Sequence, residues 1–380
     1  MPKNIMLVAG EASGDIAASI LIRDIKKLNE NISFFGIAGD LASQAGLRTI
    51  YPCKHISVTG FIEVLQHLKS ILSAMNLCKK ALKKEKPDML VLVDYPGFNL
   101  KLAKYAKKIG IPVFYYISPK IWAWKQSRIN IIRKTVAHMA VIFPFEVDIY
   151  SSANIPVTLV SHPSLEKSKA NKTKAELCIQ YNLDHNIPII CLMPGSRKSE
   201  IKNHLATMTA AANTIAAKIK CQFIIPIAST IDASLIKDQI PAELRATIHI
   251  IEGDQYNIIA ASDQIVAASG TAALEIALLG KPLCVIYKTS KISYAIAKRV
   301  IKVPFISLPN IIAGKQIIPE FIQDNASVSN IAQWVLKLQQ RPELGTAMCE
   351  ELNTIKKLLT ANGTVINVAT CLQRQLEKLN

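Results

Sequence analysis

Short apolar runs alternate with amphipathic helical stretches along the first half of the chain. The runs are rich in β-branched residues and predict strands at 4–9, 32–39, 88–94, 112–118, 138–143 and 157–161. Helical patterns fill most of the intervals between these runs. The alternation predicts an α/β domain in which helices cover a parallel sheet.

A second alternating series follows a polar stretch, rich in Lys and Asn, at 162–188. Its apolar runs predict strands at 188–195, 222–229, 247–253, 263–270 and 282–288, and the tail from 327 onward has a helical pattern. Two such series predict two Rossmann-like doubly wound domains that face each other across a cleft. In sheets of this kind, ligands collect at the carboxyl ends of the strands.

The domain boundaries follow from the same patterns. We expect a first domain over residues 1–165, a second over 166–340, and C-terminal helices over 341–380 that pack back on the first domain. A homodimer that exchanges these helices is the alternative.

Composition adds limits to this picture. The chain has 380 residues, half of them apolar, which is enough for two substantial cores. Its eight cysteines are scattered without a C-x-x-C pair, so we expect buried free thiols in a reducing cytosol. We expect no signal peptide and no membrane-spanning segment. The formal charge of +17 favours anionic partners, but no zinc-finger or RNP-like motif indicates nucleic acid.

The loop after the first predicted strand raises a question of charge. The stretch VAGEASGDI at 8–16 has the strand–glycine–helix plan of a phosphate cradle, but Glu11 and Asp15 would repel a phosphate. Asp94 ends another predicted strand and would point at the cleft mouth; a plain capping role at the next turn is the alternative. We expect these carboxylates to contact neutral sugar hydroxyls.

Two loops of the second half have the opposite character. LMPGSRKSEI at 192–201 combines a glycine for a tight turn, Ser196 as a helix cap, and the planar guanidinium of Arg197, which suits phosphate oxygens. The residues Ser269, Gly270 and Thr271 begin another helix, and Glu275 could accept hydrogen bonds from a ribose. A surface arginine in a plain loop and an ordinary helix-start glutamate are the alternatives.

A third polar segment lies within apolar surroundings at 305–323. Its side chains Asn310, Glu320 and Gln323 could line a cleft, or they could simply form a turn before a short helix.

These motifs occur together in one protein family. SGTAALE, LMPGSRKSEI and SLPNIIAGK, with VAGEASGD, DYPGFN, YYISPKIWAWKQSRI and FPFE in the first half, make the chain resemble the lipid A disaccharide synthases over nearly its full length. The resemblance implies an inverting glycosyltransferase of GT-B fold. It implies transfer of diacylglucosamine from UDP-2,3-diacylglucosamine to the 6-hydroxyl of 2,3-diacylglucosamine 1-phosphate, a step of lipopolysaccharide synthesis in Gram-negative bacteria.

The resemblance also assigns roles to residues. It implies that the UDP group is bound by Ser196, Arg197, Ser269, Gly270, Thr271, Glu275, Asn310, Glu320 and Gln323. Asp94 is the expected base, with Glu11 and Asp15 as alternatives or as groups that position the acceptor. Gly97 stands where the family commonly has a second Asp, which puts a role for that second carboxylate in doubt. Neither a cofactor nor a metal ion is expected.

An apolar stripe between residues 61 and 75 allows two interpretations. Its members recur at helical spacing and are Phe61, Val64, Leu65, Leu68, Ile71, Leu72 and Met75. Such a stripe fits a helix packed on a core. It also fits insertion into an anionic membrane surface, which acylated substrates would require. We expect peripheral association with the inner face of the cytoplasmic membrane, with Trp122 and Trp124, beside Lys120, Lys125 and Arg128, near the same surface.

Two other functions remain open on the sequence alone. A UDP-N-acetylglucosamine 2-epimerase would use the same fold and the same UDP loops. A non-catalytic protein that binds membranes or polyanions would need only the charge and the apolar stripe.

Overall fold

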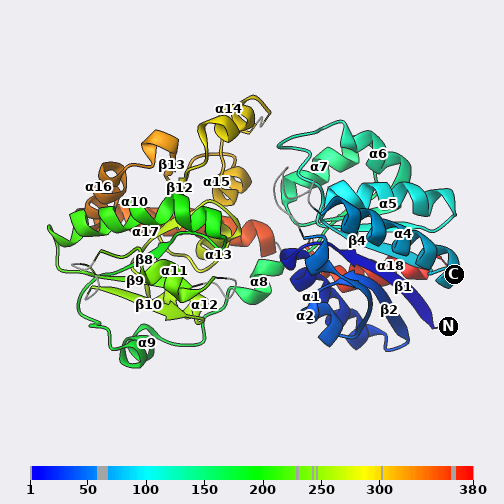
Figure 1. Cartoon of the computed structure of the whole chain (residues 1–380), viewed down its shortest axis with the longest axis horizontal. Coiled ribbons are helices and arrows are strands. Elements are labelled where there is room, and N and C mark those ends of the chain that lie inside the picture. The colour runs from blue at the N-terminus through cyan, green and yellow to red at the C-terminus, as the bar shows by residue number, and fades with distance from the viewer. Residues whose placement is uncertain are drawn as a thin grey trace. The chain divides into compact units, whose positions relative to one another are not determined.

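The chain folds into two compact α/β units (Figure 1). The computed structural model describes residues 2–57, 67–227, 231–241, 244, 247–300, 303–360 and 365–379. Unit 1 comprises Met1–Pro163 and Leu359–Asn380, and unit 2 comprises Ser164–Leu358.

Unit 1 is built on a parallel sheet of seven strands in the order β3-β2-β1-β4-β5-β6-β7. The strands are β1 (Lys3–Ala9), β2 (Ile32–Ala38), β3 (Leu47–Pro52), β4 (Met89–Val93), β5 (Val113–Tyr116), β6 (His138–Val141) and β7 (Val157–Leu159). In the central strands, residues 5–9 of β1 and all of β4 are apolar and buried, because helices cover both faces of the sheet.

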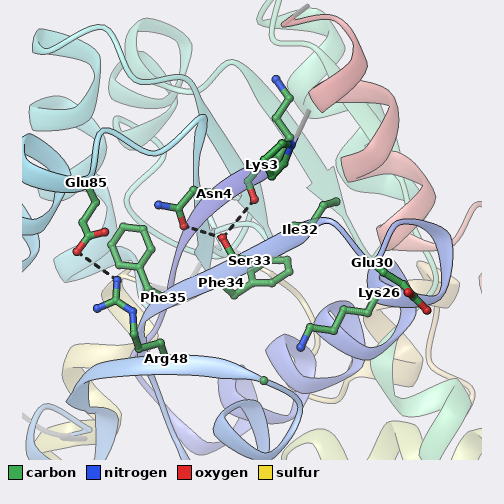
Figure 2. Close-up of a pocket in the computed structure, with 12 residues that line it drawn as sticks. Lys3, Asn4, Lys26, Glu30, Ile32, Ser33, Phe34, Phe35, Arg48 and Glu85 are labelled. Carbon is green, nitrogen blue, oxygen red and sulfur yellow. Dashed lines mark hydrogen bonds and ion pairs between the residues drawn. The ribbon is translucent and has the colours of Figure 1, made fainter.

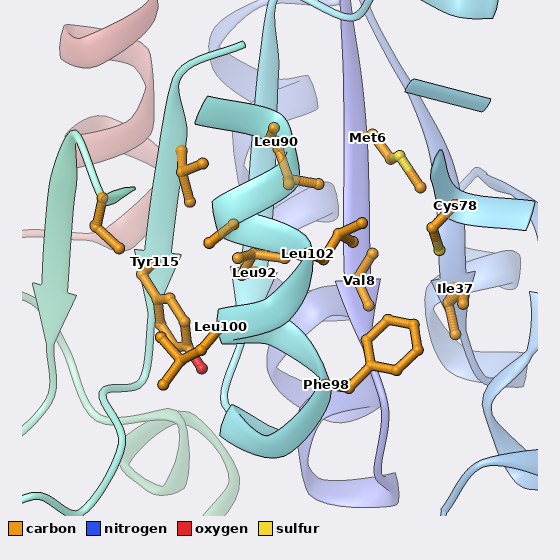
Figure 3. Packing of buried hydrophobic residues seen from close by; sticks show 14 of the residues in the cluster. Met6, Val8, Ile37, Cys78, Leu90, Leu92, Phe98, Leu100, Leu102 and Tyr115 are labelled. Carbon is orange, nitrogen blue, oxygen red and sulfur yellow. The ribbon is translucent and has the colours of Figure 1, made fainter. Parts of the chain in front are cut away.

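The helices of unit 1 form two layers. Helices α1 (Ala12–Leu28), α2 (Asp40–Gln44) and α18 (Val368–Glu377) lie together, and α4 (Leu68–Glu85), α5 (Pro96–Lys108) and α6 (Arg128–Thr135) follow one another on the opposite face (Figure 1). A 3₁₀ turn, η1 (Cys53–His55), follows β3, and α7 (Pro144–Ser152) connects β6 with β7. Figure 3 shows α5 lying along the strands, with Leu102 beside Val8 and Leu92, and Leu100 beside Tyr115.

Unit 2 repeats the plan with a parallel sheet of six strands in the order β10-β9-β8-β11-β12-β13. These are β8 (Ile189–Met193), β9 (Gln222–Ile227), β10 (Ile248–Glu252), β11 (Gln264–Ala268), β12 (Leu283–Tyr287) and β13 (Glu320–Ile322). Its helices are α8 (Pro163–Lys167), α9 (Lys174–Tyr181), α10 (Lys198–Ala216), α11 (Ala233–Lys237), α12 (Gln255–Ala261), α13 (Thr271–Leu278), α14 (Lys291–Val300), α15 (Leu308–Ala313), α16 (Val328–Gln340) and α17 (Pro342–Thr360), with a 3₁₀ turn η3 (Gln323–Asn325). Helices α10 and α16 pack together over a core that includes Leu205 and Val335.

The predicted strands and their parallel arrangement are confirmed, and two edge strands, β3 and β13, were not predicted. The prediction for the tail is partly wrong. Residues 341–358 belong to unit 2, where Leu344 and Met348 of α17 pack against its core. The part that joins unit 1 begins at Leu359 and includes α18, whose Asn367 cap donates a hydrogen bond to Asp24 of α1 at 2.8 Å.

Candidate active site

The strand order places two of the predicted loops at one point of unit 1. The strand order reverses between β1 and β4: successive strands are added on one side of β1 as far as β3, and then on its other side from β4 to β7. Strands β1 and β4 pair with Ala9 opposite Val93. The loops that follow these strands carry Glu11 and Asp94. Open α/β sheets bind ligands at such a switch point, at the carboxyl ends of the strands.

Asp94 is held at the end of β4 in an unusual backbone conformation. Asp94 and Tyr95 both have left-handed backbones, with φ of 44° and 46°. Two buried donors fix the turn: Asn99 Nδ2 and the Tyr115 hydroxyl donate to the Asp94 carbonyl at 2.7 and 2.6 Å. Left-handed non-glycine residues cost the fold energy and concentrate at functional sites.

Gly10 makes room for this turn. A Cβ atom at residue 10 would lie 2.2 Å from the ring of Tyr95, whose hydroxyl donates to the Ile56 carbonyl. The glycine of the VAGEASGD motif therefore permits the close approach of the β4 turn.

The surroundings of Asp94 suit a general base. Burial and then the negative charge of Glu11 raise the pKa of the Asp94 carboxyl to about 6, while the charges of Lys120 and Arg128 oppose the rise. A base with a pKa just below neutral pH is mostly ionised and can still accept a proton effectively. The predicted base thus has the electrostatic character that its role requires.

Asp15, predicted as a catalytic alternative, is bound by the protein's own backbone. Its buried carboxylate accepts backbone hydrogen bonds from Gly39 and Ala42 at 2.8 and 3.0 Å through one oxygen, and from Leu41 at 3.1 Å through the other. These amides form the start of α2. Asp15 therefore ties α1 to that helix start.

The loop after β5 lies beside Asp94 and is anchored by a residue that the sequence reading missed. Glu146 of α7 is 1% exposed, and its Oε1 accepts from the Ser118 hydroxyl at 2.5 Å and from Trp122 Nε1 at 3.1 Å. Burial raises the pKa of Glu146 to about 7. The motif FPFE contains this residue, but nothing in its spacing indicates which loop it holds.

Unit 2 has its own switch point between β8 and β11, where Met193 lies opposite Ala267. The loops that follow are the predicted UDP loops at 194–197 and 269–271. In the first, Glu200 Oε2 accepts from the Ser196 amide at 2.8 Å, and Glu200 Oε1 pairs with Arg197 at 2.9 Å. An exposed pair of this kind is worth only about 0–1 kcal/mol, so an anionic ligand can displace it.

Two features fix the shape of the 194–197 loop. Gly195 has φ of 124°, and a Cβ atom there would lie 2.4 Å from the Glu200 carboxylate. The buried ring of His204 donates from Nδ1 to the Pro194 carbonyl at 2.9 Å and accepts from the Lys288 amide at 3.0 Å through Nε2. His204, which the sequence reading missed, thus joins the loops that follow β8 and β12.

The second predicted UDP loop leaves the start of α13 exposed. Gly270 and Thr271 are exposed, and the Ser269 hydroxyl donates to the Ile306 carbonyl at 3.2 Å. Glu275 lies one turn further along α13 and is 8% exposed, and it accepts from the Tyr256 hydroxyl at 3.2 Å. Burial raises the pKa of the Glu275 carboxyl.

The three polar side chains of the 305–323 segment bind the protein's own backbone. Asn310, predicted to bind UDP, is fully buried and bonds to Ile317, Ile318 and Glu320. Glu320 accepts from the amides of Ile306 and Ser307, both at 3.0 Å. Gln323 exchanges two hydrogen bonds with the backbone of Thr289, at 2.8 and 3.0 Å. Asn310, Glu320 and Gln323 therefore fix the loops beside the site.

The apolar stripe at 61–75 divides between surface and core. Phe61, Val64 and Leu65 lie outside the described residues. Met75 is 8% exposed within the unit 1 core, and the partly buried Ile71 packs against that core, which fits the core interpretation of these two residues. Leu68 and Leu72 are 44% and 55% exposed on the first turns of α4.

A hollow of about 670 Å³ lies at the amino ends of β1, β2 and β3, the edge of the sheet remote from Asp94 (Figure 2). Its cations are already bound. Arg48 pairs with Glu85 at 3.2 Å, Lys3 pairs with Asp88 at 3.3 Å, and Lys26 donates to the Ala45 carbonyl at 3.1 Å. The hollow is therefore a poor candidate for an anion site.

Comparison with known proteins decides between the enzymes that share this architecture. Residues 5–362 match the family model described as lipid-A-disaccharide synthetase. The chain belongs to this family. It is 41% identical over 364 residues to the lipid-A-disaccharide synthase of Trichlorobacter lovleyi, covering 95% of this chain and 94% of that protein. It is 39% identical over 360 residues to lipid-A-disaccharide synthase 1 of Legionella pneumophila strain Lens, covering 94% of each.

Solved structures show the same fold at low identity. A UDP-N-acetylglucosamine 2-epimerase from Neisseria meningitidis, solved with UDP-N-acetylglucosamine, has a TM-score of 0.63 at 17% identity and covers 99% of this chain and 100% of that one. MurG from Acinetobacter baumannii has a TM-score of 0.57 at 13% identity and covers 99% of this chain and 100% of that one. The fold is thus GT-B, and the glycosyltransferase class comes from the family.

The described part of the chain contains no helix that is long and apolar enough to cross a membrane. Within the same residues, no cluster of three or more His, Cys, Asp or Glu side chains is placed to bind a metal ion.

Proposed function

We propose that the protein transfers 2,3-diacylglucosamine from UDP-2,3-diacylglucosamine to the 6-hydroxyl of 2,3-diacylglucosamine 1-phosphate, with inversion and release of UDP. Family membership supports the reaction. The observation that supports the assignment of roles is the pair of carboxylates, Asp94 and Glu11, at the switch point of unit 1, where the pKa of Asp94 is raised to about 6.

In this mechanism Asp94 removes the proton from the attacking hydroxyl. The raised pKa follows from burial and the charge of Glu11, so proton transfer from the hydroxyl relieves an unfavourable charge. Glu11 lies at the start of α1 and accepts hydrogen bonds from sugar hydroxyls. Displacement at the donor anomeric carbon then occurs in one in-line step, which inverts the configuration.

The loops of unit 2 bind the leaving UDP. Arg197 exchanges its pairing with Glu200 for the diphosphate, and the Ser196 amide, which now donates to Glu200, becomes available to the same group. The exposed start of α13 at Gly270 and Thr271 binds anions through its free amides. Glu275 accepts from the ribose hydroxyls. Stabilising the departing diphosphate lowers the barrier without a metal ion.

The acylated substrates also require a route from the bilayer. Leu68 and Leu72 project from α4 into solvent, and Lys79 and Lys80 follow on the same helix. Apolar side chains with basic neighbours favour an anionic membrane surface. We therefore infer peripheral attachment through the beginning of α4.

The deciding experiment measures UDP release from UDP-2,3-diacylglucosamine with and without the acceptor. Release that requires the acceptor, with a β-1′,6-linked disaccharide as product, supports the proposal. Loss of UDP without acceptor, or interconversion of UDP-N-acetylglucosamine with its 2-epimer, would contradict it. Asp94→Asn should lower turnover by roughly 100-fold or more, the usual contribution of a positioned base.

A further inference from the structure

The loop that follows β5 carries cations that the assigned roles do not use. No Asp or Glu occurs between residues 96 and 145, whereas Lys and Arg recur throughout that stretch. Within it, Lys120 and Arg128 flank the turn beside the carboxyl end of β4. The sheet register brings the start of this loop to Asp94, since Tyr116 pairs with Val93 and the Asp94 amide donates to the Tyr116 carbonyl at 3.0 Å.

We propose that Lys120 and Arg128 form the subsite for the phosphate monoester of the acceptor, next to Asp94. This inference rests on the proposed function, because that reaction requires an acceptor with a hydroxyl to be activated and a phosphate elsewhere on the same sugar.

Lys120 and Arg128 both act electrostatically on the Asp94 carboxyl. Among the described residues, no ion pair joins Asp94 to Lys120 or Arg128, although both cations lower the pKa of its carboxyl. They are therefore near Asp94 without neutralising it. The 1-phosphate and the 6-hydroxyl project from different sides of a pyranose ring. The proposed subsite therefore has the base, Asp94, on the side of the 6-hydroxyl and the two cations on the side of the 1-phosphate.

Both cations remain available to a ligand. Lys120 is exposed, and neither side chain has an acidic partner in the part of the chain that the structure describes. Arg128 lies over the ring of Trp124, with its guanidinium carbon 5.0 Å from the ring centroid. That stacking orients the guanidinium and leaves its N–H groups free to bind phosphate oxygens, a geometry in which arginine binds two oxygens at once.

The loop that holds Lys120 is rigidly anchored. Ile117 has a left-handed backbone with φ of 62°, which is rare for a β-branched residue. The buried Glu146 binds Ser118 and Trp122, the residues on both sides of Lys120. A fixed loop lowers the ordering cost of binding, so the strained backbone supports a binding role for the residue between the two anchors.

The test compares two acceptors in neutral detergent micelles, which present no anionic surface. The acceptors are 2,3-diacylglucosamine 1-phosphate and the same lipid without phosphate. For the double variant Lys120→Met/Arg128→Met, the KM for the phosphorylated acceptor should rise at least tenfold. Its preference over the dephosphorylated acceptor should fall by the same factor, with kcat at saturation and the KM for the UDP-sugar changed less than threefold.

The control removes two other positive charges, at the end of α6, the helix that Arg128 begins. Arg133→Met/Lys134→Met alters exposed residues at the end of α6 and should leave both KM values unchanged. Lys120→Met alone changes an exposed side chain and should raise the acceptor KM at least threefold, which keeps the test valid if the double variant folds poorly.

Three results would overturn the inference. The double variant could lose activity equally with both acceptors, or the wild-type protein could use both acceptors equally well while still making the disaccharide. Finally, the double variant could bind phosphatidylglycerol vesicles more weakly than the wild-type protein while its acceptor KM stays unchanged. That result would assign Lys120 and Arg128 to membrane binding. Wild-type protein that releases no UDP with either acceptor would instead refute the proposed function.

Discussion

Replacing Asp94 by Asn should make the protein more stable and nearly inactive. A carboxyl whose pKa rises from 3.8 to about 6 on folding costs the folded state about 3 kcal/mol once it is ionised, at roughly 1.4 kcal/mol per pKa unit. Asp94 keeps part of its surface in water, so we expect a gain of about 1–3 kcal/mol from removing the charge. Asn also tolerates the left-handed backbone at this position.

The pH dependence of stability tests whether the ionised Asp94 carboxylate causes the stability difference between the wild-type protein and Asp94→Asn. The folded pKa of Asp94 is raised, so its protonated form stabilises the fold below the unfolded pKa of 3.8, and this contribution is lost as the pH rises through about 6. Unfolding should therefore show a higher Tm for Asp94→Asn at pH 7.5, by roughly 2–8 °C, and converging values near pH 4. Equal or lower stability of the variant at pH 7.5 would refute this account of the site.

Further variants test the other assignments. Arg197→Met should raise the KM for the UDP-sugar at least tenfold in steady-state assays, since a charge-assisted contact to the diphosphate is lost. Asp15→Asn should lower the free energy of unfolding by about 1–3 kcal/mol with little change in KM, because it disrupts three buried backbone hydrogen bonds. Leu68→Ser/Leu72→Ser should weaken binding to phosphatidylglycerol vesicles at least tenfold without lowering Tm, since both side chains are exposed.

Each of these variants has a matched control or a contrary outcome. Arg341→Met removes an exposed arginine paired with Glu343, remote in sequence from the UDP loops, and should leave the KM unchanged. Leu28→Ser/Leu41→Ser changes leucines that are 55% and 46% exposed on other helices and should leave vesicle binding intact. A large loss of kcat in Asp15→Asn with unchanged stability would contradict its structural role.

The sequence was sufficient for the elements and their arrangement, because the strands of a covered parallel sheet are apolar on both faces and form continuous runs. The runs at 88–94 and 188–195 correspond to β4 and β8 for this reason. The edge strands β3 and β13 have half-exposed and polar positions, and β13 is only three residues long, so neither gave such a run.

The sequence by itself also determined the family and the residues at the two switch points, because a strand followed by a glycine-containing loop is a local pattern. Only the tertiary structure decided which polar side chains are free to bind a ligand. Asp15 and Glu11 belong to one motif, but backbone amides at the start of α2, distant in sequence, donate hydrogen bonds to the carboxylate of Asp15. From the sequence, Asn310 could line a cleft, but in the structure it is buried and hydrogen-bonded to the backbone of Ile318. Hydrogen-bond partners distant in the chain leave no periodic signal, and they decide whether a polar residue binds the protein or its substrate.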